Sequence, residues 1–587
     1  MANLFPQPPE VEFRPSITHC SGCEGKLKVS KTRTRSVSTL QVGRFRAREL
    51  FLICKRCGHT YRSEELRSLV PPAANFGYDV MVYAGKALFL RHRNEEEVVA
   101  ELAQKNVHIS PREVSLLGMK FVVYTAIAQQ QRAPDITADM QSRGGYICHL
   151  DATCEGRDPL LMSSIDSLSE IVLGNVKLPA EDEEHIVPFL QCIKKSFGIP
   201  LALVHDMGSG ILNAVANVFP DVPDFICHFH FFRDIGTDFL GAEYDTIRNR
   251  LRQHGIRAKL RYRAKRLKGD IDRSPELVQA LQTGFTDASL PAHVRQFLPI
   301  LNTYTLIQWA LQGLCEGHGY GFPFDHPHLI FAKRIRFLHA QAEKLQNIQL
   351  RGKWEDNIPY FKIHVDLKKI IKDKTLWKSI EALETKITVF ERLRKAMRIA
   401  PLSGRRGLND EGQKGSIRTI EKRVKKFRAW LIAHKDYPHN PYAQKMIKQI
   451  DKYWQKLFAD PITVHTPSGP IHIQPQRTNN ILEQFFRLLK RAHRRKTGNA
   501  SSSRMLRTIL AETPLVRNLE NPTYIKILLQ GKASLEEVFA EIEIDTVRQA
   551  FRDAQQTPEK IPSKLKRLIA MPDFPEKLLK MVEKAAA

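Results

Sequence analysis

Between residues 146 and 240, short apolar runs of strand length alternate with segments of helical spacing, and no other stretch constrains the fold as strongly. The pattern predicts, in chain order, three strands, a helix, a strand, a helix and a strand, over residues 146–152, 160–168, 171–178, 186–193, 200–204, 209–218 and 224–229. This order predicts an α/β domain built around one sheet.

Two aspartates end apolar strands in this region. Asp151 ends the run that starts at Ile147, and Asp206 ends the run that starts at Leu203. If the two strands are parallel neighbours, both carboxylates emerge at the same edge of the sheet. Carboxylates held close together repel unless a cation lies between them, and hard oxygen ligands suit Mg²⁺ or Mn²⁺. The alternative for each residue alone is a helix cap or an ordinary strand-end residue.

A third carboxylate, Glu483, stands in an amphipathic helix predicted over residues 477–496. The core side of this helix holds Leu482, Phe485, Phe486 and Leu489, whereas Glu483 leads a stripe of cations formed by Arg487, Lys490 and Arg494. One interpretation is a solvated Glu483–Arg487 pair worth a few tenths of a kcal/mol. The other is a metal ligand at the start of a phosphate-binding helix.

Two Cys-x-x-Cys pairs, Cys20/Cys23 and Cys54/Cys57, lie near the N-terminus and enclose a β-prone stretch. Tetrahedral zinc takes four thiolates, two from each such turn, and Gly25 and Gly58 relieve the tight backbone. Residues 18–65 are therefore predicted to be a zinc ribbon. Coincidental pairs and redox-active thiols are the alternatives.

Two helix starts follow in residues 75–135. Asn94 with Glu97, and Ser110 with Glu113, have the spacing of capping boxes, so one helix begins at each. A short turn between the two helices predicts a helix-turn-helix domain whose second helix, with Arg112 in its first turn, contacts DNA. A plain helical hairpin would give the same signals.

The chain carries an excess of positive charge, with 90 Lys and Arg against 63 Asp and Glu, a formal net charge of +27. Residues 248–268 hold ten of these cations and no acid. Such an excess favours a polyanionic partner, and nucleic acid suits it better than a membrane surface because no apolar run reaches the roughly 18 residues of a spanning helix. Residues 1–17 resemble a tail rather than a signal peptide, so we expect a reducing, cytoplasmic location.

Three sequence blocks together resemble a known family. They are His149-Leu-Asp151-Ala-Thr, then Asp206-Met-Gly-Ser-Gly running on to Cys227-His-Phe-His230, and finally Thr478-Asn-Asn-x-x-Glu483 with its basic tail. In this order they resemble the DDE transposases of the Mutator-like group that carry a Cys/Asp-x-x-His signature, and the N-terminal modules are similar to those of transposases from bacterial insertion sequences.

The resemblance implies a multidomain α+β protein. Its ribonuclease-H-like catalytic domain would have a first part at 145–240 and a second part at 461–510, interrupted by an all-α insertion at 241–460 and followed by a helical region at 511–587. Asp151, Asp206 and Glu483 would form a catalytic triad that binds two Mg²⁺ or Mn²⁺ ions, and Cys227 and His230 would support the active site. A second zinc site at Cys227 and His230, with His228, Cys148 and Cys154 nearby, is the alternative.

The implied activity is Mg²⁺-dependent DNA cleavage and strand transfer at the terminal repeats of a mobile element. The partners would be double-stranded DNA and at least one further copy of the chain, in the cytoplasm and associated with the nucleoid. Besides Arg112, the expected DNA contacts are Arg487, Lys490, Arg491, Arg494, Arg495 and Lys496. Two alternatives remain open, namely a domesticated transposase that acts as a DNA-binding regulator and a ribonuclease-H-like nuclease that never joins strands.

Overall fold

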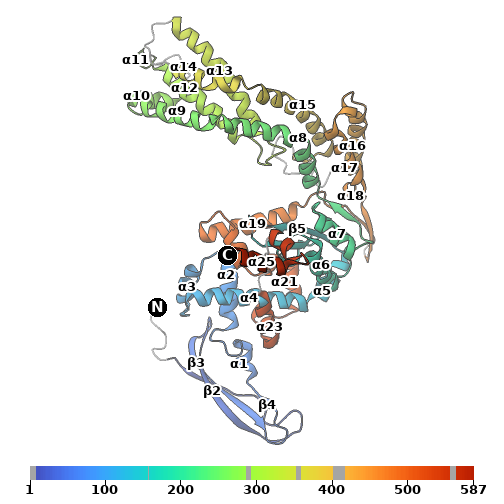
Figure 1. The fold of residues 1–587 in the computed structure, drawn as a ribbon. Coiled ribbons are helices and arrows are strands. Elements are labelled where there is room, and N and C mark those ends of the chain that lie inside the picture. Colours follow the sequence, from blue (N-terminus) through green and yellow to red (C-terminus); the bar gives the residue numbers. More distant parts are fainter. Residues whose placement is uncertain are drawn as a thin grey trace. The chain divides into compact units, whose positions relative to one another are not determined.

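The computed structural model describes residues 8–156, 158–285, 292–295, 297–351, 359–400, 417–467, 469–555 and 563–586. The chain divides into two compact units (Figure 1). Unit 1 comprises Met1–Ile226 and Pro461–Ala587, and unit 2 comprises Cys227–Asp460. Together they form a mixed α/β protein in which helices predominate.

Unit 1 begins with a small sheet in the order β1-β3-β2, with β4 also paired to β3. The long antiparallel hairpin of β2 (Leu27–Thr39) and β3 (Gly43–Cys54) projects from the helices of the unit (Figure 1). The segment expected to be a tail contributes β1 (Glu10–Phe13), which runs parallel to β3. It is held there because Phe13 is buried, with its ring centroid 6.1 Å from that of Phe45. The other elements are β4 (Thr60–Tyr61) and α1 (Glu64–Leu69).

The helices predicted after this sheet are present. Asn94 and Glu97 form a complete capping box at the start of α3 (Glu95–Ala103), whereas Ser110 accepts a single bond from the Glu113 N–H at α4 (Pro111–Gln131). At Gly85, α2 (Tyr78–Phe89) packs so tightly against α4 that a Cβ would lie 2.1 Å from the Phe121 ring. The next helix is α5 (Ala133–Ser142).

The central sheet has five strands in the order β7-β6-β5-β8-β9. The first three are antiparallel, whereas β5, β8 and β9 are parallel. In chain order the elements are β5 (Ile147–Thr153), β6 (Leu160–Asp166), β7 (Val172–Leu178), α6 (Glu183–Phe197), β8 (Ala202–His205), α7 (Ser209–Val218) and β9 (Asp224–Ile226). The predicted order is confirmed.

The predicted end of the last strand, at residue 229, is wrong. β9 ends at Ile226 and α8 begins at His228. The buried residues Phe231, Phe232 and Ile235 recur at helical rather than alternating spacing, and a short apolar run does not separate these two periods.

One apolar core joins the helices α2–α4, the central sheet and the C-terminal helices. A buried polar network crosses it, because Gln129 of α4 donates to the Leu173 carbonyl at 3.0 Å and accepts bonds from Asn518 at 2.9 Å and Tyr524 at 2.8 Å. Asn518 also binds both the N–H and the carbonyl of Val172 at 2.8 Å. The contributing C-terminal elements are η4 (Thr513–Glu520), α21 (Pro522–Leu529), α22 (Leu535–Ala540) and α23 (Ile544–Ala554).

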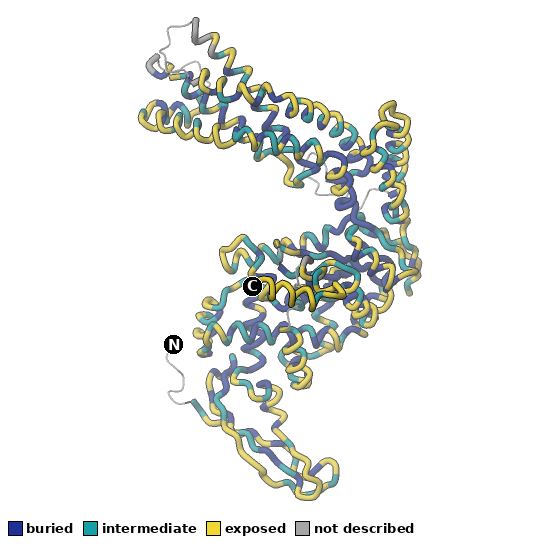
Figure 2. The backbone as a smooth tube through the Cα atoms, viewed as in Figure 1, coloured by how far each residue is buried: buried dark blue, intermediate teal, exposed yellow. Residues whose placement is uncertain are grey.

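The rest of unit 1 follows residue 461. The hairpin of β10 (Ile462–Thr466) and β11 (Gly469–Ile473) precedes α19 (Asn480–Thr497) and α20 (Ser503–Thr508). The last helices are α24 (Ser563–Ile569) and α25 (Phe574–Ala586), and α25 is exposed along its length (Figure 2).

In unit 2, every α or β element that the structure describes is a helix. Asp373 joins α8 (His228–Gln253) to α15 (Lys374–Met397), because it caps α15 and accepts bonds from Arg250 of α8 at 2.8 Å and from His254, which follows α8, at 2.7 Å. Among the described helices of the whole chain, no apolar stretch has the length and hydropathy needed to cross a membrane. The α-helices of unit 2 are α8 (His228–Gln253), α9 (Ile256–Ile271), α10 (Pro275–Thr283), α11 (Ala292–Arg295), α12 (Leu298–Gln312), α13 (Pro327–Arg351), α14 (Pro359–Ile371), α15 (Lys374–Met397), α16 (Ile417–Ile432), α17 (Pro441–Lys452) and α18 (Trp454–Leu457).

Candidate functional site

Asp151 and Asp206 lie at adjacent positions in the register of two parallel strands, β5 and β8. Leu150 of β5 is the partner of His205, the last residue of β8, and each is followed by one of the two aspartates. Asp206 comes directly after its strand as predicted, whereas Asp151 does not end its strand, because β5 continues to Thr153. Asp151 is 7% exposed, and Asp206 is half-buried. The two acids therefore lie at the same edge of the sheet, as the strand pattern predicted.

The start of α19 is fixed to this edge by Asn479. Its side chain donates to the Leu150 carbonyl at 2.6 Å, and its amide oxygen lies 2.9 Å from Nδ1 of His149. An asparagine before a helix normally caps the free N–H groups of that helix, but Asn479 makes no such bond. Its side chain instead forms the two hydrogen bonds that attach α19 to β5.

His149 is completely buried, and burial lowers its pKa to about 4, although the bond to Asn479 opposes this shift. The ring is therefore neutral near pH 7. Because the Asn479 amide nitrogen bonds Leu150, its oxygen faces the ring, and we assign the proton to Nδ1 of His149 as the donor.

Glu483 lies in the first turn of α19, where its N–H donates to the Asn479 carbonyl at 3.1 Å. The apolar side of α19 packs Leu482, Phe485 and Phe486 against residues of β6 and β7. The helix is thus held both by its apolar side and by Asn479. These contacts bring the first turn, with Glu483, to the strand that carries Asp151.

The rest of α19 is strongly basic. Arg487, Arg491, Arg494 and Arg495 are exposed, Lys490 is half-exposed, and none of the five is ion-paired with an acid in the described part of the chain. Lys496 differs, because its ammonium lies 2.7 Å from the Glu95 carboxylate of α3. Arg112, in the first turn of α4, is exposed.

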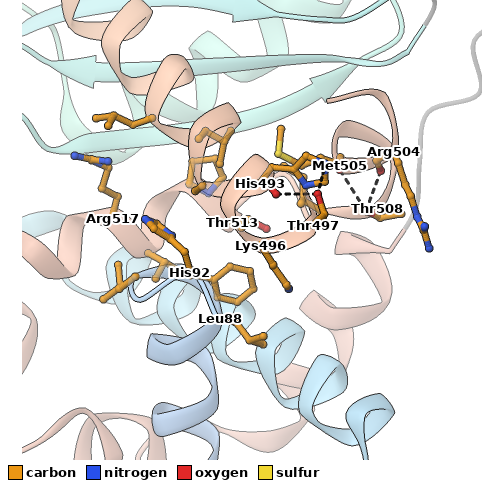
Figure 3. Close-up of a pocket in the computed structure, with 18 of the residues that line it drawn as sticks. Leu88, His92, His493, Lys496, Thr497, Arg504, Met505, Thr508, Thr513 and Arg517 are labelled. Atoms are coloured by element: carbon orange, nitrogen blue, oxygen red, sulfur yellow. Dashed lines mark hydrogen bonds between the residues drawn. The ribbon is translucent and has the colours of Figure 1, made fainter. Parts of the chain in front are cut away.

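A pocket of about 710 Å³ lies beside this basic segment. Figure 3 shows Leu88 and His92 on one side and His493, Lys496 and Thr497 of α19 on the other. Burial, followed by the charge of Arg495, lowers the pKa of His92, which favours the neutral form of its ring.

The four N-terminal cysteines form a compact cluster that could bind a structural metal ion. Their sulfur atoms all lie within 4.8 Å of one another, and the pairs Cys20–Cys57 and Cys23–Cys54 are 3.5 Å apart. A tetrahedral zinc ion with bonds of about 2.3 Å needs sulfurs about 3.8 Å apart, so the cluster has suitable dimensions.

Of the two glycines next to the cysteines, Gly58 has the left-handed backbone of a tight turn, whereas Gly25 does not and instead leaves space for a cysteine sulfur. Gly58 has a φ of +74°, and a Cβ at Gly25 would lie 2.9 Å from the Cys54 sulfur. Bonds from the Tyr61 hydroxyl and from the backbone of Gly22 lower the pKa of Cys20 to about 6, which favours the thiolate that a metal requires.

Cys227 and His230 belong to unit 2. Cys227 is buried immediately before α8, and His230 is buried in the first turn of that helix. Their support of an active site stays a prediction.

Sequence reasoning gave no role to His149 or Asn479, although both stand inside the blocks that carried the resemblance. Their positions two residues before Asp151 and four before Glu483 were the available signal. The hydrogen bond between them depends on a contact 330 residues apart in sequence, which no local pattern encodes.

No protein-family model matches the chain, and no curated protein matches it either.

Proposed function

We propose that this chain is a DNA transposase of the DDE type, with Asp151, Asp206 and Glu483 as ligands of two Mg²⁺ or Mn²⁺ ions. The observation that carries the proposal is the shared sheet edge. Asp151 in β5 and Asp206 directly after β8 follow the paired residues Leu150 and His205, and Asn479 attaches the helix of Glu483 to β5. Three carboxylates form a hard oxygen donor set, which suits these cations.

The strand order supports a ribonuclease-H-like assignment for the central sheet. That fold is expected to have three antiparallel strands followed by two parallel ones, with the first strand of the domain in the middle of the sheet. The order β7-β6-β5-β8-β9 has this arrangement, with β5 in the middle. Unit 2 would then be the helical insertion, because it interrupts unit 1 between β9 and β10. The N-terminal sheet with its four cysteines would be a zinc ribbon, and α3 with α4 a helix-turn-helix.

In the proposed reaction, a water oxygen attacks a phosphorus at the element end and the 3′ oxygen leaves. The freed 3′-hydroxyl then attacks target DNA, and a 3′ oxygen of the target leaves. A bound pair of divalent ions stabilises the attacking and leaving oxygens of such in-line displacements, so no protein nucleophile is needed. His149 and Asn479 position Glu483, and the unpaired cations of α19 hold the phosphodiester backbone. Two element ends imply at least two copies of the chain.

The test uses the full chain with a duplex that carries the repeats flanking its own gene, with and without Mg²⁺. We expect cleavage with strand joining in the wild type. Cleavage alone would indicate a nuclease, and a bandshift without cleavage would indicate a DNA-binding regulator; either result overturns the proposal.

Substitution of the triad locates the chemistry. We expect Asp151→Asn, Asp206→Asn and Glu483→Gln each to abolish cleavage while DNA binding is retained. Asp221→Asn, at an exposed acid of the same unit, is the matched control and should retain full activity. A triad variant with undiminished cleavage would remove that residue from the site.

A further inference from the structure

Unit 2 contains a groove of about 400 Å³ between α9 and α12. One wall carries Arg261, Lys265 and Lys268, which are spaced by four and three residues and so share one face of α9. The other wall is formed by α12 and the 3-10 helix η1 (Gly313–Cys315). Its polar members are Tyr304, Gln308 and Gln312, with Cys315 beyond them. The groove therefore places three cations opposite hydroxyl and amide groups.

The charge of this wall is only partly compensated. Lys268 is paired with Asp272, but Arg261 and Lys265 form no ion pair with any acid that the structure describes. On the same helix, Arg263 is bound to Asp366 at 2.7 Å and lies outside the groove. The uncompensated cations that line the groove thus face a space bordered by further hydrogen-bond donors.

We propose that this groove binds the sugar–phosphate backbone of double-stranded DNA, independently of the carboxylate site. Guanidinium, ammonium, amide and hydroxyl groups all donate to phosphate oxygens, and cations at spacings of three and four along a helix present a line of charge to a polyanion. None of the described residues that line the groove is acidic. The choice of DNA over another polyphosphate rests on the proposed function.

The first test compares two double variants on opposite faces of α9. Arg261→Gln with Lys265→Gln removes two groove cations, whereas Lys259→Gln with Arg266→Gln removes two exposed cations that do not line the groove. Binding of a labelled duplex is measured by anisotropy at several salt concentrations, in EDTA to prevent strand chemistry. Tryptophan fluorescence checks folding, because all five tryptophans lie in unit 2.

We expect the groove variant to bind the duplex on the order of tenfold more weakly than the wild type. The slope of the logarithm of the binding constant against the logarithm of the salt concentration should decrease in magnitude by about 2, because each lost phosphate contact removes about one released counterion. The control pair should change both quantities much less. Equal effects of the two pairs, or no effect of the groove pair, would overturn the proposal.

The second test uses Cys315, which is exposed and lines the groove. Its alkylation rate is followed by peptide mass spectrometry, with exposed Cys192 of unit 1 as the internal reference. We expect duplex DNA to protect Cys315 in the wild type but not in the groove variant, and tripolyphosphate to give no such protection. Protection by tripolyphosphate but not by DNA would assign the groove to a small polyphosphate and reject our proposal. If duplex DNA protects Cys315 but the triad substitutions do not affect cleavage, the transposase proposal is rejected and the proposal that the groove binds DNA is retained.

Discussion

Asn479 accepts a hydrogen bond from the buried ring of His149 at 2.9 Å, and this bond joins the strand of Asp151 to the helix of Glu483. The two residues are 330 positions apart, and the whole of unit 2 lies between them in the sequence. The relative positions of the candidate carboxylates therefore depend on a contact formed only by the folded chain.

The first prediction concerns pH. The pKa of His149 is lowered to about 4 in the fold, whereas an unfolded histidine titrates near 6.5. Below about pH 6.5 the unfolded state therefore binds a proton that the folded state excludes, so stability falls as the pH decreases towards 4. Between pH 7.5 and 5 we expect unit 1 to lose about 2 kcal/mol from this group.

His149→Asn is the matched variant, because an asparagine amide can still donate to Asn479 but does not titrate. Hydrogen exchange of the β5 amides measures the effect, since unit 1 contains no tryptophan. A wild type and variant with the same pH dependence would contradict this prediction.

The second prediction concerns the buried network. Asn518→Leu removes the acceptor of the Val172 N–H, and an orphaned buried donor, with the other lost bonds, should cost about 3 kcal/mol. Tyr524→Phe removes the hydroxyl that donates to Gln129 but leaves the Val172 N–H with its acceptor, and should cost about 1 kcal/mol. Exchange of the Val172 amide is the measurement. It should accelerate strongly in the first variant and weakly in the second, and the reverse order would show that the network is not stabilising β7.

The third prediction concerns the four cysteines. Gly25→Ala places a Cβ 2.9 Å from the Cys54 sulfur, so the cluster must open and zinc binding should weaken. Gly22→Ala is the control because a Cβ at Gly22 meets no atom within 4 Å. Elemental analysis of purified protein should find about one zinc per chain in the wild type and the control. Full zinc content in Gly25→Ala would refute the predicted steric conflict.

The fourth prediction separates two cations of α19. Arg494 is exposed, whereas Lys496 is bound to Glu95 at 2.7 Å. Arg494→Gln should therefore lower the salt dependence of DNA binding by about one counterion, and Lys496→Gln should change it much less. Anisotropy titrations at several salt concentrations provide the comparison. Equal slopes in the two variants would mean that the ion pair does not withhold Lys496 from DNA.

Local signals determined a large part of the fold from the sequence. The strand order around Asp151 and Asp206, the helix starts at Asn94 and Ser110, and the proximity of the four cysteines were all predictable. Each of these features depends on side-chain periodicity, helix capping or motif spacing. Such signals can be recognised in the sequence because the residues that produce them lie close together along the chain.

Only the tertiary structure decided how distant segments complete one another. The C-terminal helices gave no motif, yet Asn518 and Tyr524 close the core against α4 and β7. Likewise, the sequence does not distinguish Lys496 from the other cations of its helix, whereas in the structure Lys496 is paired with Glu95. Whether a side chain is buried or ion-paired depends on residues that are hundreds of positions away in the sequence. A local sequence pattern does not specify which of these residues it will contact in the folded chain.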